Sequence, residues 1–171
     1  MSILEVRGLR KTFGPVTAVA DISFEVNAGE VFTIIGPNGA GKTTTLEMIE
    51  GLQPPDAGTI SIDGLTWGRD AERIKCRIGV QPQSSAVFEL LTLQENLELF
   101  ATFYPKSRTA DEVLDMINLT EHRHKRVKSL SGGQRQRLAI GLGMINDPDI
   151  IFLDEPTTGL DPQARRNIWD I

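Results

Sequence analysis

Stretches in which hydrophobic and polar residues alternate occupy the first third of the chain. They cover residues 3–7, 16–26 and 58–63, contain many β-branched residues and are separated by turn-forming residues. Alternation with a period of two is typical of strands with one buried face. The pattern therefore predicts an antiparallel sheet near the N-terminus.

Continuous apolar runs follow a different pattern. Residues 31–35 and 150–153 are almost entirely apolar, and residues 77–80 form a shorter run. Parallel strands that are buried on both faces have this composition. These three segments are predicted to form the parallel core of the protein.

Helix start signals occupy the middle of the chain. Residues 42–50 read as a helix that Gly51 ends, and a last helix is expected from Asp161-Pro162. Between them, three residues each precede a Glu or Gln by three positions, as in a capping box, and each predicts a helix: Thr92, Thr109 and Ser131. The predicted fold class is α/β, with an antiparallel β layer and a helical insertion.

Composition narrows the possible functions. The chain has 171 residues, enough for one domain, and a net charge of −5, which argues against broad nucleic-acid binding. Cys76 is alone, so neither a disulfide framework nor a cysteine zinc site is expected, and a cytosolic setting fits. The N-terminus lacks the pattern of a signal peptide, and no apolar run is long enough to span a bilayer.

A glycine-rich loop joins the apolar run 31–35 to the helix predicted after it. Gly36–Thr43 fits the pattern G-x-x-x-x-G-K-[ST], which cradles a nucleotide triphosphate. Its glycines turn successive N–H groups toward phosphate, Lys42 supplies a positive charge, and Thr43 offers a hydroxyl to Mg²⁺. The buried strand, loop and helix around the motif favour this interpretation over a chance glycine-rich turn.

A second phosphate signature follows in Leu130-Ser131-Gly132-Gly133-Gln134. A capping box explains Ser131 and Gln134, but it does not explain two glycines in a first helical turn, where each costs roughly 1 kcal/mol relative to alanine. They make sense where another group must approach the backbone closely. The bare N–H groups of a helix N-terminus, with a serine hydroxyl, suit a γ-phosphate.

An acidic pair ends the apolar run 150–153. Asp154 can hold Mg²⁺ through water, and Glu155 can orient or deprotonate an attacking water. Gln81 and Gln83 follow the run 77–80, and either could be merely a solvated turn residue.

Together, the glycine loop, the Leu130–Gln134 sequence and the acidic pair resemble the nucleotide-binding domain of the ATP-binding cassette (ABC) family, over nearly the whole chain. The resemblance implies a P-loop core with a RecA-like parallel sheet, formed by residues 1–83 and 146–171 of a single domain 1–171, and a helical subdomain over 84–145. It also implies that the domain is incomplete at its C-terminal end.

The resemblance also assigns the binding residues. Glu155, Gln83 and Lys42 are the implied catalytic residues, and Thr43, Gln83 and Asp154 the implied Mg²⁺ ligands. Gln83 is preferred to Gln81 because its spacing fits the family better. Phe13 would stack on adenine, although it could also be an ordinary core aromatic. The implied ATP contacts are Phe13, Gly36, Pro37, Asn38, Gly39, Ala40, Gly41, Lys42, Thr43, Thr44, Ser131, Gly132, Gly133, Gln134 and Asp161.

The function implied is ATP binding and hydrolysis, with ATP and Mg²⁺ as cofactors, on the inner face of the cell membrane. The implied partners are a second nucleotide-binding domain in a head-to-tail dimer and a transmembrane permease; no nucleic acid is expected. The residues 157–166 resemble ATPases of drug and ABC-2-type exporters. The alternatives are a soluble ABC ATPase acting in translation and a nucleotide-binding fragment without turnover.

Two features of the sequence bear on these alternatives. The family carries a switch histidine beyond the acidic pair, whereas His122 and His124 both precede Ser131, so weak hydrolysis is expected of residues 1–171. These two histidines belong to a basic cluster over residues 122–128, which is either a solvated loop or a contact with a membrane surface or a partner.

Overall fold

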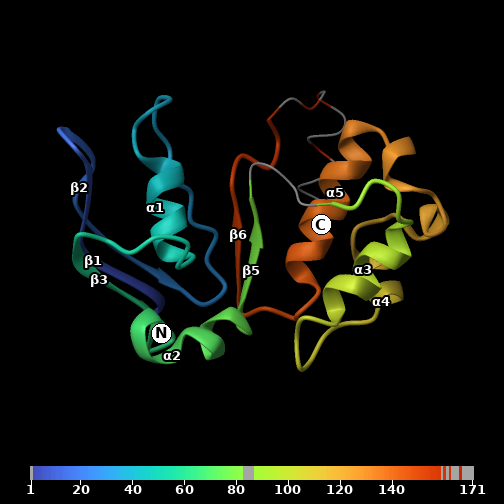
Figure 1. Ribbon diagram of the computed structural model, residues 1–171, viewed down its shortest axis with the longest axis horizontal. Coiled ribbons are helices and arrows are strands. Elements are labelled where there is room, and N and C mark those ends of the chain that lie inside the picture. Colours follow the sequence, from blue (N-terminus) through green and yellow to red (C-terminus); the bar gives the residue numbers. More distant parts are fainter. Residues whose placement is uncertain (1, 83–86, 159, 161, 163–165, 167–171) are drawn as a thin grey trace. The chain divides into compact units, whose positions relative to one another are not determined.

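The computed structural model describes residues 2–82, 87–158, 160, 162 and 166 (Figure 1). The chain divides into two compact units, Met1–Lys75 and Cys76–Ile171, and each is described by itself. An α/β fold with antiparallel and parallel strands is confirmed.

Unit 1 contains a four-stranded antiparallel sheet. Its strands are β1 (Ser2–Phe13), β2 (Val16–Asn27), β3 (Ala57–Ile62) and β4 (Leu65–Thr66), in the order β2-β1-β3-β4. The alternating pattern predicted this sheet, although β1 extends further than residues 3–7 and the short β4 was not expected.

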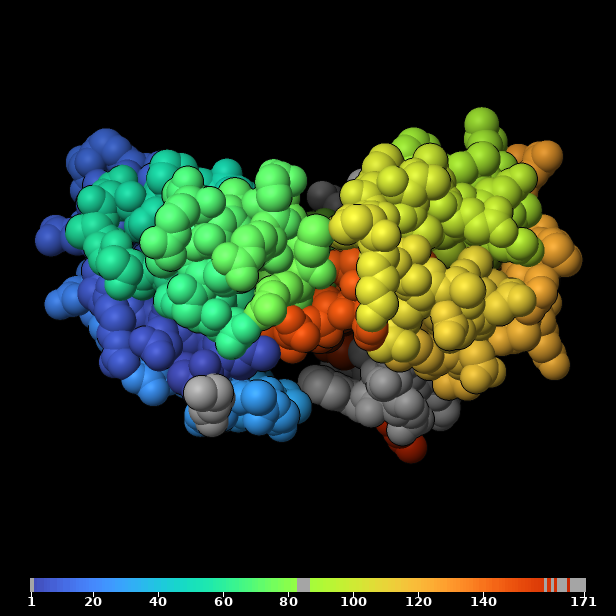
Figure 2. Space-filling view, turned by 90° about the horizontal axis from the view of Figure 1, so that it is seen from below, coloured from blue at the N-terminus to red at the C-terminus, as the bar shows by residue number. Residues whose placement is uncertain are grey.

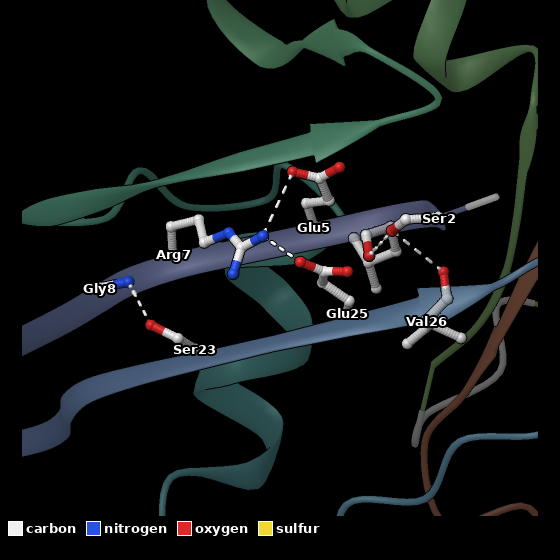
Figure 3. A network of polar contacts seen from close by, with 8 residues as sticks. Ser2, Glu5, Arg7, Gly8, Ser23, Glu25 and Val26 are labelled. Atoms are coloured by element: carbon white, nitrogen blue, oxygen red, sulfur yellow. Dashed lines mark hydrogen bonds and ion pairs between the residues drawn. The ribbon is translucent and has the colours of Figure 1, made fainter.

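The β1–β2 pair is irregular, and side chains compensate for this (Figure 3). Its register shifts between Val6 and Leu9, where Gly8 adopts a φ of 57°. The N–H of Gly8 donates to the Ser23 hydroxyl at 2.8 Å, and Arg7 forms an ion pair with Glu25. A side-chain acceptor thus satisfies the backbone donor at the bulge.

Two helices complete unit 1. Helix α1 (Lys42–Ile49) was predicted, and Gly51, with a φ of 75°, follows its end. Helix α2 (Trp67–Lys75) was missed, because its residues are mostly polar. Helix α2, bright green in Figure 2, packs against β3 and β4. The buried side chains of the unit include Leu4, Val6, Leu9, Val19, Met48, Ile49, Ile60, Ile62, Leu65 and Ile74.

The strand predicted over residues 31–35 is wrong for this structure. The segment has no regular secondary structure, and Val31 and Ile35 are 86% and 89% exposed. A strand requires hydrogen bonds to a neighbour, and among the described residues no neighbouring strand pairs with this segment. An apolar run alone does not supply that neighbour.

Unit 2 contains the parallel strands β5 (Ile78–Gln81) and β6 (Ile150–Leu153), as predicted. Helix α5 (Gly132–Met144) packs closely on β5. A Cβ at Gly79 would lie 1.8 Å from the Gly143 carbonyl oxygen, so only glycine permits this approach. This contact holds the C-terminal part of α5 against β5.

The rest of unit 2 is helical, with α3 (Leu93–Ala101), α4 (Ala110–Met116) and the short 3₁₀ turns η1 (Thr120–His122) and η2 (Val127–Ser129). All three predicted capping boxes are present. The helices share one apolar core, made up of Leu93, Leu97, Val113, Leu114, Ile117, Leu119, Val127, Leu138, Leu142 and Ile145.

Candidate functional site

The candidate residues belong to both units, and the glycine loop lies in unit 1. Gly39 and Gly41 have φ values of 81° and 82°, which L-residues rarely adopt. The Ala40 N–H donates to the Pro37 carbonyl at 3.2 Å and closes a turn within the loop. The left-handed residues reverse the peptide planes, an arrangement that makes an anion-binding nest.

Gly41 also fixes the position at which α1 begins. A Cβ at this residue would lie 2.2 Å from the Ala18 carbonyl oxygen on β2. Gly41 is the N-cap residue of α1, and no N-cap side chain accepts a hydrogen bond from the N–H groups of the first turn. The positive end of the helix dipole is therefore at the loop.

Lys42 spans the glycine loop. Its ammonium group donates to the carbonyls of Gly36 and Pro37, both at 3.0 Å. These bonds hold a full positive charge beside the backbone turns, while Pro37–Ala40 is exposed to solvent. The loop thus combines a lysine charge and a helix N-terminus, which together attract phosphate.

Phe13 is the last residue of β1 and is 50% exposed, so it is not a core aromatic. Asp56 braces this strand end: it accepts hydrogen bonds from the N–H and hydroxyl of Thr12, both at 2.7 Å, and pairs with Lys11 at 3.3 Å. These hydrogen bonds from Thr12 lower the pKa of Asp56. The Lys11 ammonium lies 5.7 Å from the Phe13 ring.

The acidic pair lies directly after β6 in unit 2. Asp154 is 9% exposed, and its N–H donates to the Gln81 carbonyl at 3.1 Å, which continues the pairing of β5 with β6. The pairing fixes the backbone that carries the carboxylate. A buried carboxylate at the carboxyl end of a parallel strand is a suitable Mg²⁺ ligand.

Glu155 has an unusual backbone. Its φ is 47°, and the other non-glycine residues with positive φ among those described are Asp or Asn: Asp21, Asp63, Asn118 and Asp147. Asp and Asn tolerate this region, whereas a longer side chain there costs about 1–2 kcal/mol. The Thr158 hydroxyl donates to the Glu155 carboxylate at 3.0 Å and orients it.

The two glutamine candidates differ in what the structure shows. Gln83, the preferred one, lies outside the described residues, as does Asp161. Gln81 is 1% exposed, and its Nε2 donates to the Pro82 carbonyl at 2.6 Å, while its Oε1 has no hydrogen-bond partner among the described residues. Gln81 is therefore not a solvated turn residue.

Ser131 caps α5 and is exposed. Its hydroxyl accepts from the Gln134 N–H at 3.2 Å, and its own N–H donates to the Gln134 side chain at 3.0 Å. Gly132 is exposed and does not have a positive φ; a Cβ there would meet only Leu160, at 4.0 Å. Contacts among the described residues therefore do not require glycine at this position.

Sequence reasoning missed two supporting residues. Thr158 orients Glu155, and Asp56 braces the end of β1 that carries Phe13. The spacing of Thr158, three residues after Glu155, could have suggested a turn contact. Nothing local points to Asp56, because its partner Thr12 is distant in sequence.

A sequence profile described as "ABC transporter" matches residues 19–158, which is most of the chain. The chain belongs to the ABC transporter family. It is 44% identical, over 98% of its length, to the Nod factor export ATP-binding protein I of Ralstonia nicotianae. It is 39% identical to the linearmycin resistance ATP-binding protein LnrL of Bacillus subtilis, again over 98% of its length.

This ABC chain spans about half the length of these curated relatives, 54% and 56%. Among solved structures it resembles an ATP-binding cassette of an ABC transporter in its ADP conformation, with a TM-score of 0.88, 29% identity, and coverage of 99% of this chain and 75% of the other. It also resembles a dimeric cassette bound to ADP and Pi, with a TM-score of 0.82, 31% identity and coverage of 96% and 79%. The P-loop fold class is thereby confirmed.

No helix among the described residues has the length and apolar character needed to cross a bilayer. No three or more His, Cys, Asp or Glu side chains in that part of the chain gather as a metal site. Mg²⁺ bound with a nucleotide needs only one or two carboxylates, so a site based on Asp154 remains compatible with the second finding.

Proposed function

We propose that this ABC chain is the ATP-binding and ATP-hydrolysing part of an exporter. The observation that carries the proposal is the glycine loop, in which two left-handed glycines, the α1 N-terminus and the Lys42 ammonium all serve one short backbone turn. Such a loop suits the charged oxygens of a triphosphate.

Lys42 is the residue that holds the β- and γ-phosphates in this proposal. The two carbonyls that now accept from its ammonium lie in the loop itself, so a phosphate in the loop would compete for a group already directed there. Thr43 and Asp154 would hold Mg²⁺, since hydroxyl and carboxylate oxygens are the hard ligands that this ion prefers. The ion would neutralise charge on the phosphate oxygens.

Glu155 is the proposed general base. The hydrogen bond from Thr158 fixes one carboxylate oxygen and leaves the other to accept a proton from water. Its left-handed backbone supports a functional role, because strained residues cluster at sites where the side chain must point in one direction.

Ser131, Gly132 and Gln134 are proposed to bind the ATP of a second cassette. The capping box leaves this helix start exposed, and a Cβ at Gly132 would make only an ordinary contact with Leu160, so another molecule can approach the backbone. The similar solved cassette that is dimeric with ADP and Pi supports such pairing. Gln83 and Asp161 would join the nucleotide site as the family resemblance implies.

The remaining parts of the proposal concern the partners. Relatives named for Nod factor export and linearmycin resistance support an exporter, with a transmembrane permease as partner and a location at the inner face of the membrane. The helical region 84–145 would transmit the closure of the cassette dimer to that permease. No nucleic-acid partner is proposed, given the net charge of −5.

The test is nucleotide titration of the parent protein and of Lys42→Ala, monitored with a fluorescent ATP analogue. We expect binding to be lost in the variant, because the charge that faces the phosphates is removed. Lys75→Ala, which removes an exposed lysine paired with Glu72, is the matched control and should bind as the parent does. Equal affinity in the parent and Lys42→Ala would refute the assignment of the loop.

A further inference from the structure

Two segments of unit 2 run side by side in opposite directions, residues 89–94 and 123–128 (Figure 1, light green and orange). Thr92 and Arg126 form an antiparallel bridge between them. We call this pair of segments the basic ribbon. Four backbone bonds hold it together: Gln94 N–H to Arg123 O at 3.1 Å, Leu93 N–H to Lys125 O at 3.2 Å, Val127 N–H to Leu91 O at 3.0 Å and Lys128 N–H to Glu89 O at 3.1 Å.

Local acids neutralise only part of the charge of the basic ribbon. Asp111 pairs with Arg123 at 2.9 Å, but Glu89 is itself paired with Arg135, at 2.8 Å. The exposed Lys125 and Lys128 have no ion pair with any residue that the structure describes. Positive charge therefore gathers on one exposed ribbon of a chain whose net charge is −5.

Arg126 adds to this charge, and Glu95 interacts with it only weakly. The Glu95 carboxylate is committed to its own helix cap, where it accepts from the Thr92 N–H at 2.7 Å. Its pKa is lowered mainly by that bond, and Arg126 makes only the last and smallest contribution. Glu95 therefore takes up little of the charge of Arg126.

Exposed apolar residues occur within the ribbon and at its end. Leu90, within the ribbon, is 71% exposed, and Phe88 is 50% exposed. The Leu91 N–H donates to the Phe88 carbonyl at 3.2 Å, so Phe88 is tied to the end of the ribbon. The centroid of its ring lies 6.4 Å from that of Phe100. The Phe100 centroid in turn lies 5.6 Å from that of Phe103, which is 65% exposed. A purely solvated basic loop would account for the lysines but not for these exposed apolar groups.

We propose that the basic ribbon, with Leu90 and Phe88, is a docking surface for an anionic lipid bilayer. Lysine and arginine side chains near such a surface are attracted to the acidic headgroups, and adjacent leucine and phenylalanine side chains insert at the boundary of the acyl chains. The surface would hold the cassette against the membrane independently of a permease. The proposal rests on the proposed function only in that an exporter subunit works at a membrane.

The test uses the full-length protein and protein-free vesicles, so no permease is involved. Vesicles of phosphatidylglycerol mixed with phosphatidylcholine should sediment the protein at low salt, and 0.5 M salt should reverse most of the binding, since salt screens exposed charges. Vesicles of phosphatidylcholine alone should bind little. Equal binding to both kinds of vesicle would overturn the charge-based part of the inference and with it the proposal.

Two double variants distinguish binding by this surface from binding caused by the net charge of the whole protein. Lys125→Glu with Lys128→Glu should weaken binding to the anionic vesicles roughly tenfold or more, because each cation near the surface contributes about fivefold. Lys75→Glu with Lys106→Glu makes the same change of net charge at exposed lysines elsewhere and should retain parental binding. Equal losses in the two double variants would refute the proposal.

Leu90→Ser tests the apolar contribution and leaves the charge unchanged. It should weaken vesicle binding several-fold, and parental binding by this variant would show that insertion plays no part and overturn the proposed surface. A labelled single-stranded RNA of about 20 nucleotides serves as a competing ligand class: binding to RNA without binding to vesicles would also overturn it. ATP titration of each variant should match the parent, which separates failure of this proposal from failure of the ATPase proposal.

Discussion

Gly132→Ala separates a structural role for glycine from a role in recognition. Gly132 lies in the first turn of α5, is exposed and does not have a positive φ. An added Cβ would meet only the Leu160 side chain, at 4.0 Å, which is an ordinary contact. The fold as described therefore accommodates alanine without any shift.

The expected effect on stability follows from helix propensity. Alanine in place of glycine stabilises a helix interior by roughly 0.5–1 kcal/mol, and less in a first turn, so the free energy of unfolding should rise by about 0.5 kcal/mol. Gly41→Ala is the contrasting variant, because its φ is 82° and its Cβ would lie 2.2 Å from the Ala18 carbonyl oxygen. That variant should lose about 2 kcal/mol or more, from the left-handed backbone and the clash together. Urea unfolding followed by circular dichroism measures both.

The functional readout is ATP-dependent dimerisation, measured by sizing chromatography. In a full-length protein that also carries Glu155→Gln, Gly132→Ala should weaken dimerisation although it stabilises the monomer, because the methyl group occupies space that the second cassette's nucleotide needs. Unchanged dimerisation would refute the reasoning. So would a loss of more than about 1 kcal/mol in monomer stability, since the glycine would then be structural.

Two further predictions concern carboxylates. Glu155→Gln in the full-length protein should bind ATP as the parent does and accumulate the dimer, while phosphate release falls by a factor of about 10² or more, because an amide cannot act as a base; release at the parental rate would contradict the assignment. Hydrogen bonding, chiefly by the Thr109 N–H, lowers the pKa of Glu112 from 4.5, so its stabilising contribution is fully present above pH 4.5 and is lost as the pH falls through the lower folded value. Glu112→Gln should therefore reduce the pH dependence of the free energy of unfolding in that range. An unchanged pH dependence, measured by urea unfolding at a series of acidic pH values, would contradict this.

Local chemistry made much of the fold predictable. The capping boxes at Thr92, Thr109 and Ser131 each began a helix, because a side chain and a backbone N–H three residues apart satisfy each other without help from the rest of the protein. The glycine loop was predictable for the same reason, since Gly39 and Gly41 supply left-handed dihedrals that few other residues adopt.

Features that depend on distant partners were not predictable. Residues 31–35 have the composition of a buried strand, but a strand forms only where another strand accepts its hydrogen bonds. Helix α2 was missed for the opposite reason, because its mostly polar sequence does not reveal two long-range contacts. Ile74 is buried, and the indole N–H of Trp67 donates to the Ile49 carbonyl at 2.8 Å. In both cases the partner, and not the segment, decides the structure.

Glu155 shows how a local conflict can point to a site. Helix and strand preferences explain most of the described backbone, and the Asp and Asn residues with positive φ are ones that tolerate this conformation. Glutamate is not one of the residues that tolerate this conformation, so Glu155 at φ 47° is strained. The hydrogen bond from the Thr158 hydroxyl offsets only part of the strain energy. Glycine or asparagine would suit the backbone better, which supports the proposal that glutamate is kept at this position for its chemistry. That is the expected mark of a residue kept for its chemistry, because conflicts between local preference and fold concentrate where function demands them.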